Sequence, residues 1–183
     1  QNKSIGKYTG GLVAFNKAAT GGGMTFGGGD TCNVVIEKLT VQGNEAERAG
    51  GGLLQQGNSK LHLGAAEIID NVSGKIGGGL CISSKTHCTM DGTIFRNNTG
   101  KTEGGAFYVY TASSAICDNL PVEGNHAVNT GGGIFSRGRL HLKNSVVTGN
   151  TADGNGGGIG TYRVGTNRIN KNSYMTLENV EIK

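Results

Sequence analysis

The sequence predicts an all-β protein, a single-stranded parallel β-helix (a solenoid) of six to seven coils, with three short strands and about 27 residues in each coil. The first observation is that 35 of the 183 residues are glycine, against a usual share of about 7%. The second is that glycine triplets recur about once every 27 residues. The third is that the segments between the triplets carry strand patterns and no helical periodicity, which is typical of a stacked solenoid.

One phrase recurs six times along the chain. It consists of a Val, Ile or Phe, two further residues, an Asn, five residues, a Gly-Gly-Gly or Gly-Gly-Ala triplet, and a large apolar residue. The first copy is one residue shorter between its Asn and its triplet. The spacings between successive asparagines are 28, 27, 27, 27 and 25 residues. The asparagines of the six copies are Asn16, Asn44, Asn71, Asn98, Asn125 and Asn150.

The first strand of each coil is expected about ten residues before the asparagine. The residues ten and eight positions before it are mostly apolar and flank a residue of mixed character, as Leu61 and Leu63 flank His62. Such short alternation predicts a strand with one buried face. The five apolar pairs are Val34/Ile36, Leu61/Leu63, Cys88/Met90, Ala115/Cys117 and Leu140/Leu142.

The second strand leads into the residue three positions before the asparagine, and the third strand follows the glycines. Coils of a β-helix stack at the strand spacing of about 4.8 Å, so equivalent inward side chains should form columns. One predicted column is Val13, Val41, Ile68, Phe95, Val122 and Val147, and another is Met24, Leu53, Leu80, Phe107, Ile134 and Ile159.

The glycines and the asparagines are expected at the corners of the coil. Glycine can adopt positive φ and allows close approach of neighbouring backbones. Stacked asparagine amides can hydrogen-bond along the solenoid axis and cap corner backbone groups, so the six asparagines are predicted to form an inward structural ladder. The predicted corner glycines are Gly50, Gly51, Gly77, Gly78, Gly104, Gly105, Gly131, Gly132, Gly156 and Gly157.

Residues 1–183 are predicted to be a single β-helix segment of a longer repeat protein. The stretch Met175–Ile182 matches Leu140–Val147, which indicates that a seventh coil has begun. Residues Tyr162–Tyr174 have no counterpart in the other copies and are predicted to be an inserted loop.

The charge pattern argues against a nucleic-acid partner, and the distribution of apolar residues argues against a membrane span. The 17 Lys and Arg residues and 13 Asp and Glu residues give a net charge of +4 and are scattered along the chain, which argues against a nucleic-acid partner. No run of about 18 apolar residues is present, so no direct membrane span is expected. No cofactor is expected either.

One pair of carboxylates is a weak candidate for chemistry. Asp91 and Asp118 occupy the same position in adjacent coils, at the strand spacing of about 4.8 Å. Two carboxylates at that reach can act as general acid and nucleophile or as oxygen ligands of calcium. The preferred interpretation is a solvated pair whose repulsion Lys143 relieves from the next coil. Otherwise no metal site is predicted.

The cysteines and the N-x-S/T sequons bear on the compartment. Cys81 and Cys88 flank a six-residue turn and could form a disulfide, which would indicate an oxidising compartment. Asn97 and Asn2 are candidate glycosylation sites. Asn71 also lies in a sequon, but its predicted inward position makes it a poor acceptor. On the surface, Arg96 and Glu123 share a column and are expected to form an ion pair.

The repeats from Val13 to Ile182 resemble a known family, and two segments match its motifs strictly. Phe95-Arg96-Asn97-Asn98 has the form F-x-x-N, and Gly104-Gly105-Ala106-Phe107 follows it with a G-G-A motif. Alternating motifs of these two kinds resemble the repeats of the chlamydial polymorphic outer-membrane proteins. The resemblance implies a right-handed parallel β-helix, a location on the cell surface and a role in adhesion to host cells.

The expected function is a non-enzymatic extracellular structural or adhesive module, a rigid rod for surface display, cell adhesion or filament assembly. Its partner is expected to be a protein or glycan surface, or further copies or coils of the same protein. The expected location is extracellular or at the cell surface, associated with the outer membrane if the source is bacterial. The alternative is a carbohydrate-active or calcium-dependent enzyme that acts at Asp91 and Asp118. Ice binding is a weak third alternative, because the threonines do not line up coil after coil.

Overall fold

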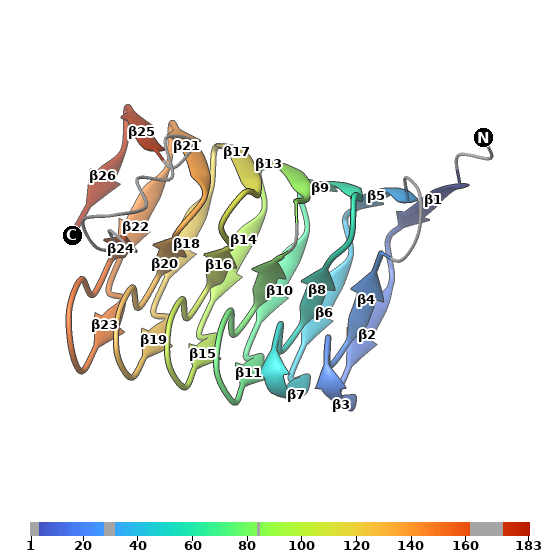
Figure 1. Cartoon of the computed structure of the whole chain (residues 1–183), viewed down its shortest axis with the longest axis horizontal. Helices are drawn as coiled ribbons and strands as arrows, with labels where there is room; N and C mark the ends of the chain where they lie inside the picture. The colour runs from blue at the N-terminus through green and yellow to red at the C-terminus, as the bar shows by residue number, and fades with distance from the viewer. Residues whose placement is uncertain (1–3, 28–31, 84, 162–173) are drawn as a thin grey trace.

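The computed structural model describes residues 4–27, 32–83, 85–161 and 174–183, and these residues form a parallel β solenoid (Figure 1). The coils stack along the longest axis of the molecule, with β1 (Ser4–Thr9) at one end and β25 (Tyr174–Glu178) and β26 (Glu181–Ile182) at the other. Four sheets run the length of the stack, and all of their strand pairings are parallel. The predicted fold class, a parallel solenoid of about six coils with a spacing of roughly 27 residues, is confirmed.

Sheets A and B contain the two strands that precede each asparagine. Sheet A consists of β1 (Ser4–Thr9), β5 (Cys32–Glu37), β9 (Lys60–Gly64), β13 (His87–Asp91), β17 (Ser114–Asp118), β21 (Arg139–Lys143) and β25 (Tyr174–Glu178). Sheet B consists of β2 (Leu12–Ala14), β6 (Thr40–Gln42), β10 (Glu67–Ile69), β14 (Ile94–Arg96), β18 (Pro121–Glu123), β22 (Val146–Thr148) and β26 (Glu181–Ile182).

Sheets C and D contain the strands that follow the asparagine and the glycine triplet. Sheet C consists of β3 (Lys17–Thr20), β7 (Glu45–Ala49), β11 (Val72–Ser73), β15 (Thr99–Gly100), β19 (His126–Ala127) and β23 (Thr151–Ala152). Sheet D consists of β4 (Met24–Phe26), β8 (Leu53–Gln55), β12 (Leu80–Ile82), β16 (Phe107–Val109), β20 (Ile134–Ser136) and β24 (Ile159–Thr161).

A complete coil therefore has four strands, and the prediction of three was wrong on this point. Sheet C is the additional sheet, and its strands β11, β15, β19 and β23 span only two residues each. Each contributes one small residue to the inside, for example Ser73, Gly100 and Ala127. With no pair of large apolar residues in this segment, no alternating pattern was available to predict it.

The predicted columns form most of the core, which also contains buried residues outside them such as Leu39, Ile82 and Leu120. Val41, Ile68, Phe95, Val122 and Val147 are fully buried and align in register between neighbouring coils. Leu53, Leu80, Phe107 and Ile134 form the equivalent buried column of sheet D. Burial of each such side chain contributes about 1.5–3 kcal/mol to folding. The core is therefore continuous through the interior coils of the stack.

The glycine triplets close the corner between sheets C and D. The first glycine of each triplet has positive φ, for example +69° at Gly104. The second lies against backbone, and a Cβ at Gly105 would lie 2.1 Å from the carbonyl oxygen of Gly132. Any side chain at the second position would therefore push neighbouring coils apart.

Differences in repeat length arise mostly at one corner, the connection from sheet D to sheet A. Four residues connect β8 to β9, β12 to β13 and β16 to β17, whereas two residues, Arg137 and Gly138, connect β20 to β21. This shorter connection accounts for the 25-residue spacing between Asn125 and Asn150. The predicted insertion follows β24 at the same corner, and its residues 162–173 lie outside the described residues. Strands β25 and β26 beyond it pair with β21 and β22, so the predicted seventh coil is present in sheets A and B.

Candidate functional site

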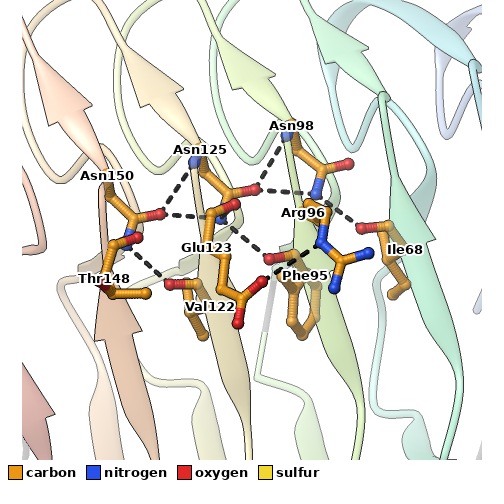
Figure 2. Close-up of polar contacts among 9 residues, drawn as sticks. All are labelled: Ile68, Phe95, Arg96, Asn98, Val122, Glu123, Asn125, Thr148 and Asn150. Carbon is orange, nitrogen blue, oxygen red and sulfur yellow. Dashed lines mark hydrogen bonds and ion pairs between the residues drawn. The ribbon is translucent and has the colours of Figure 1, made fainter.

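The asparagines form a continuous ladder of side-chain amides that faces inward (Figure 2). In its central part, Asn98 Nδ2 donates to Asn125 Oδ1 at 3.0 Å, and Asn125 Nδ2 donates to Asn150 Oδ1 at 2.9 Å. The same oxygens also accept backbone N–H groups, such as Asn98 N to Asn125 Oδ1 at 2.9 Å. Each amide oxygen from Asn44 to Asn150 therefore satisfies two donors of the preceding coil.

The second amide hydrogen of these asparagines caps the corner between sheets B and C. Asn98 Nδ2 donates to the carbonyl oxygen of Ile68 at 2.7 Å, and Asn125 Nδ2 donates to that of Phe95 at 3.1 Å. Asn71, Asn98 and Asn125 have no exposed surface. The ladder thus provides hydrogen bonds to buried backbone groups and presents nothing to a ligand.

The structure brings Asp91 and Asp118 together on the outer face of sheet A. The two residues are paired in register on β13 and β17. Asp118 Oδ1 accepts a hydrogen bond from Asn144 Nδ2 at 2.8 Å, while Asp91 is exposed. Lys143 is in register with Asp118, but its ammonium group lies 3.7 Å from a carboxylate oxygen of Glu178. No group of three or more His, Cys, Asp or Glu side chains converges on one point within the described residues.

The predicted Cys81–Cys88 disulfide is wrong, because all four cysteines carry free thiols. Cys81 packs against Leu54 and Tyr108 on the outer side of sheet D, whereas Cys88 lies in the central core. The two side chains therefore lie on opposite sides of the solenoid wall. Burial raises the pKa of the Cys81 thiol to about 12 and raises that of Cys88 further.

Two predicted sequon positions lie among the described residues. Asn97 is exposed at a turn with φ of +55°, while Asn71 is buried within the ladder. Asn2 lies outside the described residues. Arg96, next to Asn97, forms the predicted ion pair with Glu123, with Nε 3.3 Å from Oε2 (Figure 2). Exposed pairs of this kind contribute at most about 1 kcal/mol.

A second apolar cluster, which the sequence analysis missed, covers the outer side of sheet D. It contains Leu54, Cys81, Tyr108 and Phe135. The rings of Tyr108 and Phe135 are stacked, with their centroids 5.5 Å apart. The Arg137 guanidinium lies 5.6 Å from the centre of the Phe135 ring and forms two hydrogen bonds to the Glu103 carboxylate. The signal was a second apolar residue directly after the large residue that follows the triplet, which is present in four of the six copies.

The sequence analysis also missed a groove of about 460 Å³ on the outer face of sheet A. Its walls are side chains from β13, β17, β21 and β25. The ionisable side chains among them are His87, Arg139, His141 and Lys143, and Tyr174 adds an aromatic ring. The available signal was the set of outward residues that alternate with the apolar pairs of these strands.

These features define a class, the parallel β-helical repeat proteins, held by core columns, glycine corners and an asparagine ladder. Within that class, the chain belongs to the family whose model is described as periplasmic copper-binding protein (NosD), which matches residues 17–183. No curated protein and no solved structure matches the chain significantly. The resemblance to the chlamydial outer-membrane repeats is thus supported only at the level of the β-helix. Among the described residues, no helix is long and apolar enough to cross a membrane.

Proposed function

We propose that the protein is a non-enzymatic extracellular structural module, a rigid rod that presents its outer faces to a protein surface, a glycan or further copies of itself. The observation that carries this proposal is the unbroken stack of core columns and amide ladder from Asn16 to Asn150. Surface display, adhesion and filament assembly are the roles that such a rod can serve.

The pairing pattern supports a rigid rod. Strands β5, β9, β13, β17 and β21 of sheet A each pair with a neighbour on both sides, and the interior strands of the other sheets do the same. Bending the stack would break parallel ladders in four sheets at once, and it would also separate buried amides whose unsatisfied groups cost about 1–3 kcal/mol each. The family description as periplasmic agrees with a location outside the cytoplasm.

The alternative is a carbohydrate-active or calcium-dependent enzyme at Asp91 and Asp118. Their pairing on adjacent strands of sheet A favours it, because neighbouring carboxylates can act as acid and nucleophile or bind calcium. The hydrogen bond from Asn144 to Asp118 favours the solvated structural role instead. We retain the enzyme as the second candidate.

The copper named in the family description does not fit the side chains that the structure describes. The soft donors closest to one another in the sequence pattern are Cys88, Met90 and Cys117, and all three lie in the apolar core. A cysteine binds copper as the thiolate, whereas burial raises the pKa of Cys88 and Cys117 well above the usual value. The thiols therefore act as small apolar groups of the core. Neutral imidazole also binds copper, but within the described residues no group of three or more His, Cys, Asp or Glu side chains converges on one point.

An experiment that measures binding and turnover together tests the proposal. The purified chain is applied to immobilised extracellular polysaccharides and to intact cells, and both retention and the release of new reducing ends are measured. A structural module is retained without releasing product. Product formation that disappears in both Asp91→Asn and Asp118→Asn would establish the enzyme instead, with Glu37→Gln on the same column of sheet A as the matched control.

A further inference from the structure

We propose that the groove on the outer face of sheet A binds an acidic oligosaccharide, a linear chain of uronic acid units that lies along the solenoid axis. This inference rests on the proposed role as a module that presents its outer faces, and it names the ligand of one face. It is carried by the charge, the exposed apolar surface and the strand pairing of the groove.

The charge of the groove is positive along one edge. Lys60, His87, Ser114 and Arg139 follow one another in register at the start of β9, β13, β17 and β21. The pKa of His87 lies below its usual value because of burial and because of the positive charges of Lys60 and Arg139. The two positive charges that contribute to this lowering would also attract carboxylates.

Carboxylates of the protein lie at the margins of this groove. The side chains of the described residues that line it include no carboxylate. A carboxylate oxygen of Glu178 lies 3.9 Å from His141 Nε2 and 3.7 Å from Lys143 Nζ. Asp118 lies at the far end of β17 from Ser114, where it accepts a hydrogen bond from Asn144. Arg139 and His87 therefore remain the groups best placed to meet an anionic ligand.

Apolar surface is exposed beside these charges. The Ile116 side chain is 46% exposed and Tyr174 is 58% exposed, and both line the groove. Ligand sites commonly combine such apolar surface with a few charged groups that fix orientation. The C–H faces of pyranose rings suit an aromatic ring and a branched aliphatic side chain, while ring carboxylates suit Arg139.

The strand pairing favours a glycan over an acidic peptide. β13, β17 and β21 pair on both sides, so their backbone groups cannot accept an added peptide strand, which is how extended peptides gain affinity at sheet edges. Recognition must therefore use side chains alone. These recur at the coil spacing of about 4.8 Å, and a stiff ligand with regularly spaced carboxylates loses little conformational entropy on meeting them.

Calorimetric titration of the full chain with a hexamer of galacturonic acid tests the inference at low salt. We expect binding to the wild type and at least tenfold weaker binding to Arg139→Gln, while Arg139→Lys retains most of it. Arg48→Gln is the matched control, because Arg48 is exposed on β7 of sheet C and its loss changes the net charge equally. A second readout is the NMR titration of His87, whose pKa should rise when the ligand binds.

Four outcomes would overturn the inference: no binding of the hexamer, equal binding of its methyl ester, equal weakening by Arg48→Gln, or equally tight binding of oligoglutamate. The last would assign the groove to acidic peptides. None of these outcomes would show catalysis, so the structural proposal stands or falls separately on product release.

Discussion

At the scale of single residues, the asparagine of the repeat is the side chain whose hydrogen bonds no other residue type could replace. Asn98 Oδ1 accepts from the backbone and the side chain of Asn71, and Asn98 Nδ2 donates to both Ile68 O and Asn125 Oδ1. Only a short amide has two donors and an acceptor at this reach. Aspartate at this position would lack both donors and would place a buried charge in every coil.

Asn98→Ala should therefore destabilise the protein by about 3 kcal/mol, because it leaves several buried backbone and amide groups without partners. Urea unfolding followed by circular dichroism measures the change. Asn97→Gly is the control, since residue 97 is exposed at φ of +55° and glycine already occupies the equivalent positions 43, 124 and 149. A neutral Asn98→Ala would contradict the structural role of the ladder.

The second glycine of a triplet is restricted by space. A Cβ on Gly105 would contact the backbone of Gly132 and His126, so Gly105→Ala should cost about 3 kcal/mol through overpacking. Ala106→Gly, one residue later, should cost only about 1 kcal/mol, the backbone entropy of glycine. Equal decreases in the thermal midpoint for the two variants would contradict the claim that only the second position lacks room for a side chain.

His87 makes stability depend on pH in a defined direction. Its pKa in the folded protein is below the usual 6.5, so the unfolded chain binds the proton first as the pH falls. Stability is therefore unaffected above about pH 7 and decreases as the pH falls through 6.5 toward the folded pKa, below which the loss is complete. Urea midpoints at pH 7.5 and 5.5 should differ less in His87→Gln than in the wild type, and an unchanged difference would rule out this contribution.

At the scale of the strands, predictability depended on the number of large inward residues. Sheets A, B and D were predicted because pairs such as Leu61 and Leu63, or single residues such as Phe95, recur in register. Sheet C was missed because Ser73 and Gly100 carry no such signal. The Cys81–Cys88 disulfide was wrong because chain proximity was considered without the alternation that places successive strand residues on opposite faces.

The coil is the unit that can be removed without loss of register. Deleting residues 99–125 joins Asn98 to His126, which takes the register position of Thr99, so the shortened chain should retain cooperative unfolding with a smaller m value. Deleting residues 99–124 instead joins Asn98 to Asn125 and shifts every later side chain by one position, which exchanges inward and outward faces. Circular dichroism and urea titration compare the two, and folding of both to equal stability would contradict the column model.

At the scale of the whole molecule, the fold was predictable because every coil repeats the same pattern of strands, asparagine and glycine triplet. The groove on sheet A was not predictable, because no single repeat contains it. It needs His87 from one coil, Ile116 from the next, Arg139 from a third and Tyr174 from a fourth. The outer cluster of Tyr108 and Phe135 was missed for a related reason, since only two coils place an aromatic ring there.

Adding Cu(I) or Cu(II) should leave the thermal midpoint of the full chain unchanged. A ligand that binds the folded state raises its stability, and the core thiols Cys88 and Cys117 are fully buried with a raised pKa. Differential scanning calorimetry at one and five equivalents of metal measures the shift, with EDTA-treated protein as the reference. A rise that persists in Cys88→Ser would locate a copper site elsewhere in the chain, and a rise abolished by that change would place it in the core.

The connection from sheet D to sheet A is the part of the coil whose length the fold does not fix. It has four residues in three coils and two in another, and the flanking strands still pair in register. Lengthening a flexible loop costs only about 0.6 kcal/mol for each doubling. New sequence can therefore enter the molecule at this corner, coil by coil, while the columns stay intact. The solenoid offers a row of equally spaced graft points along one edge, where foreign epitopes or binding loops could be arrayed in a chosen order.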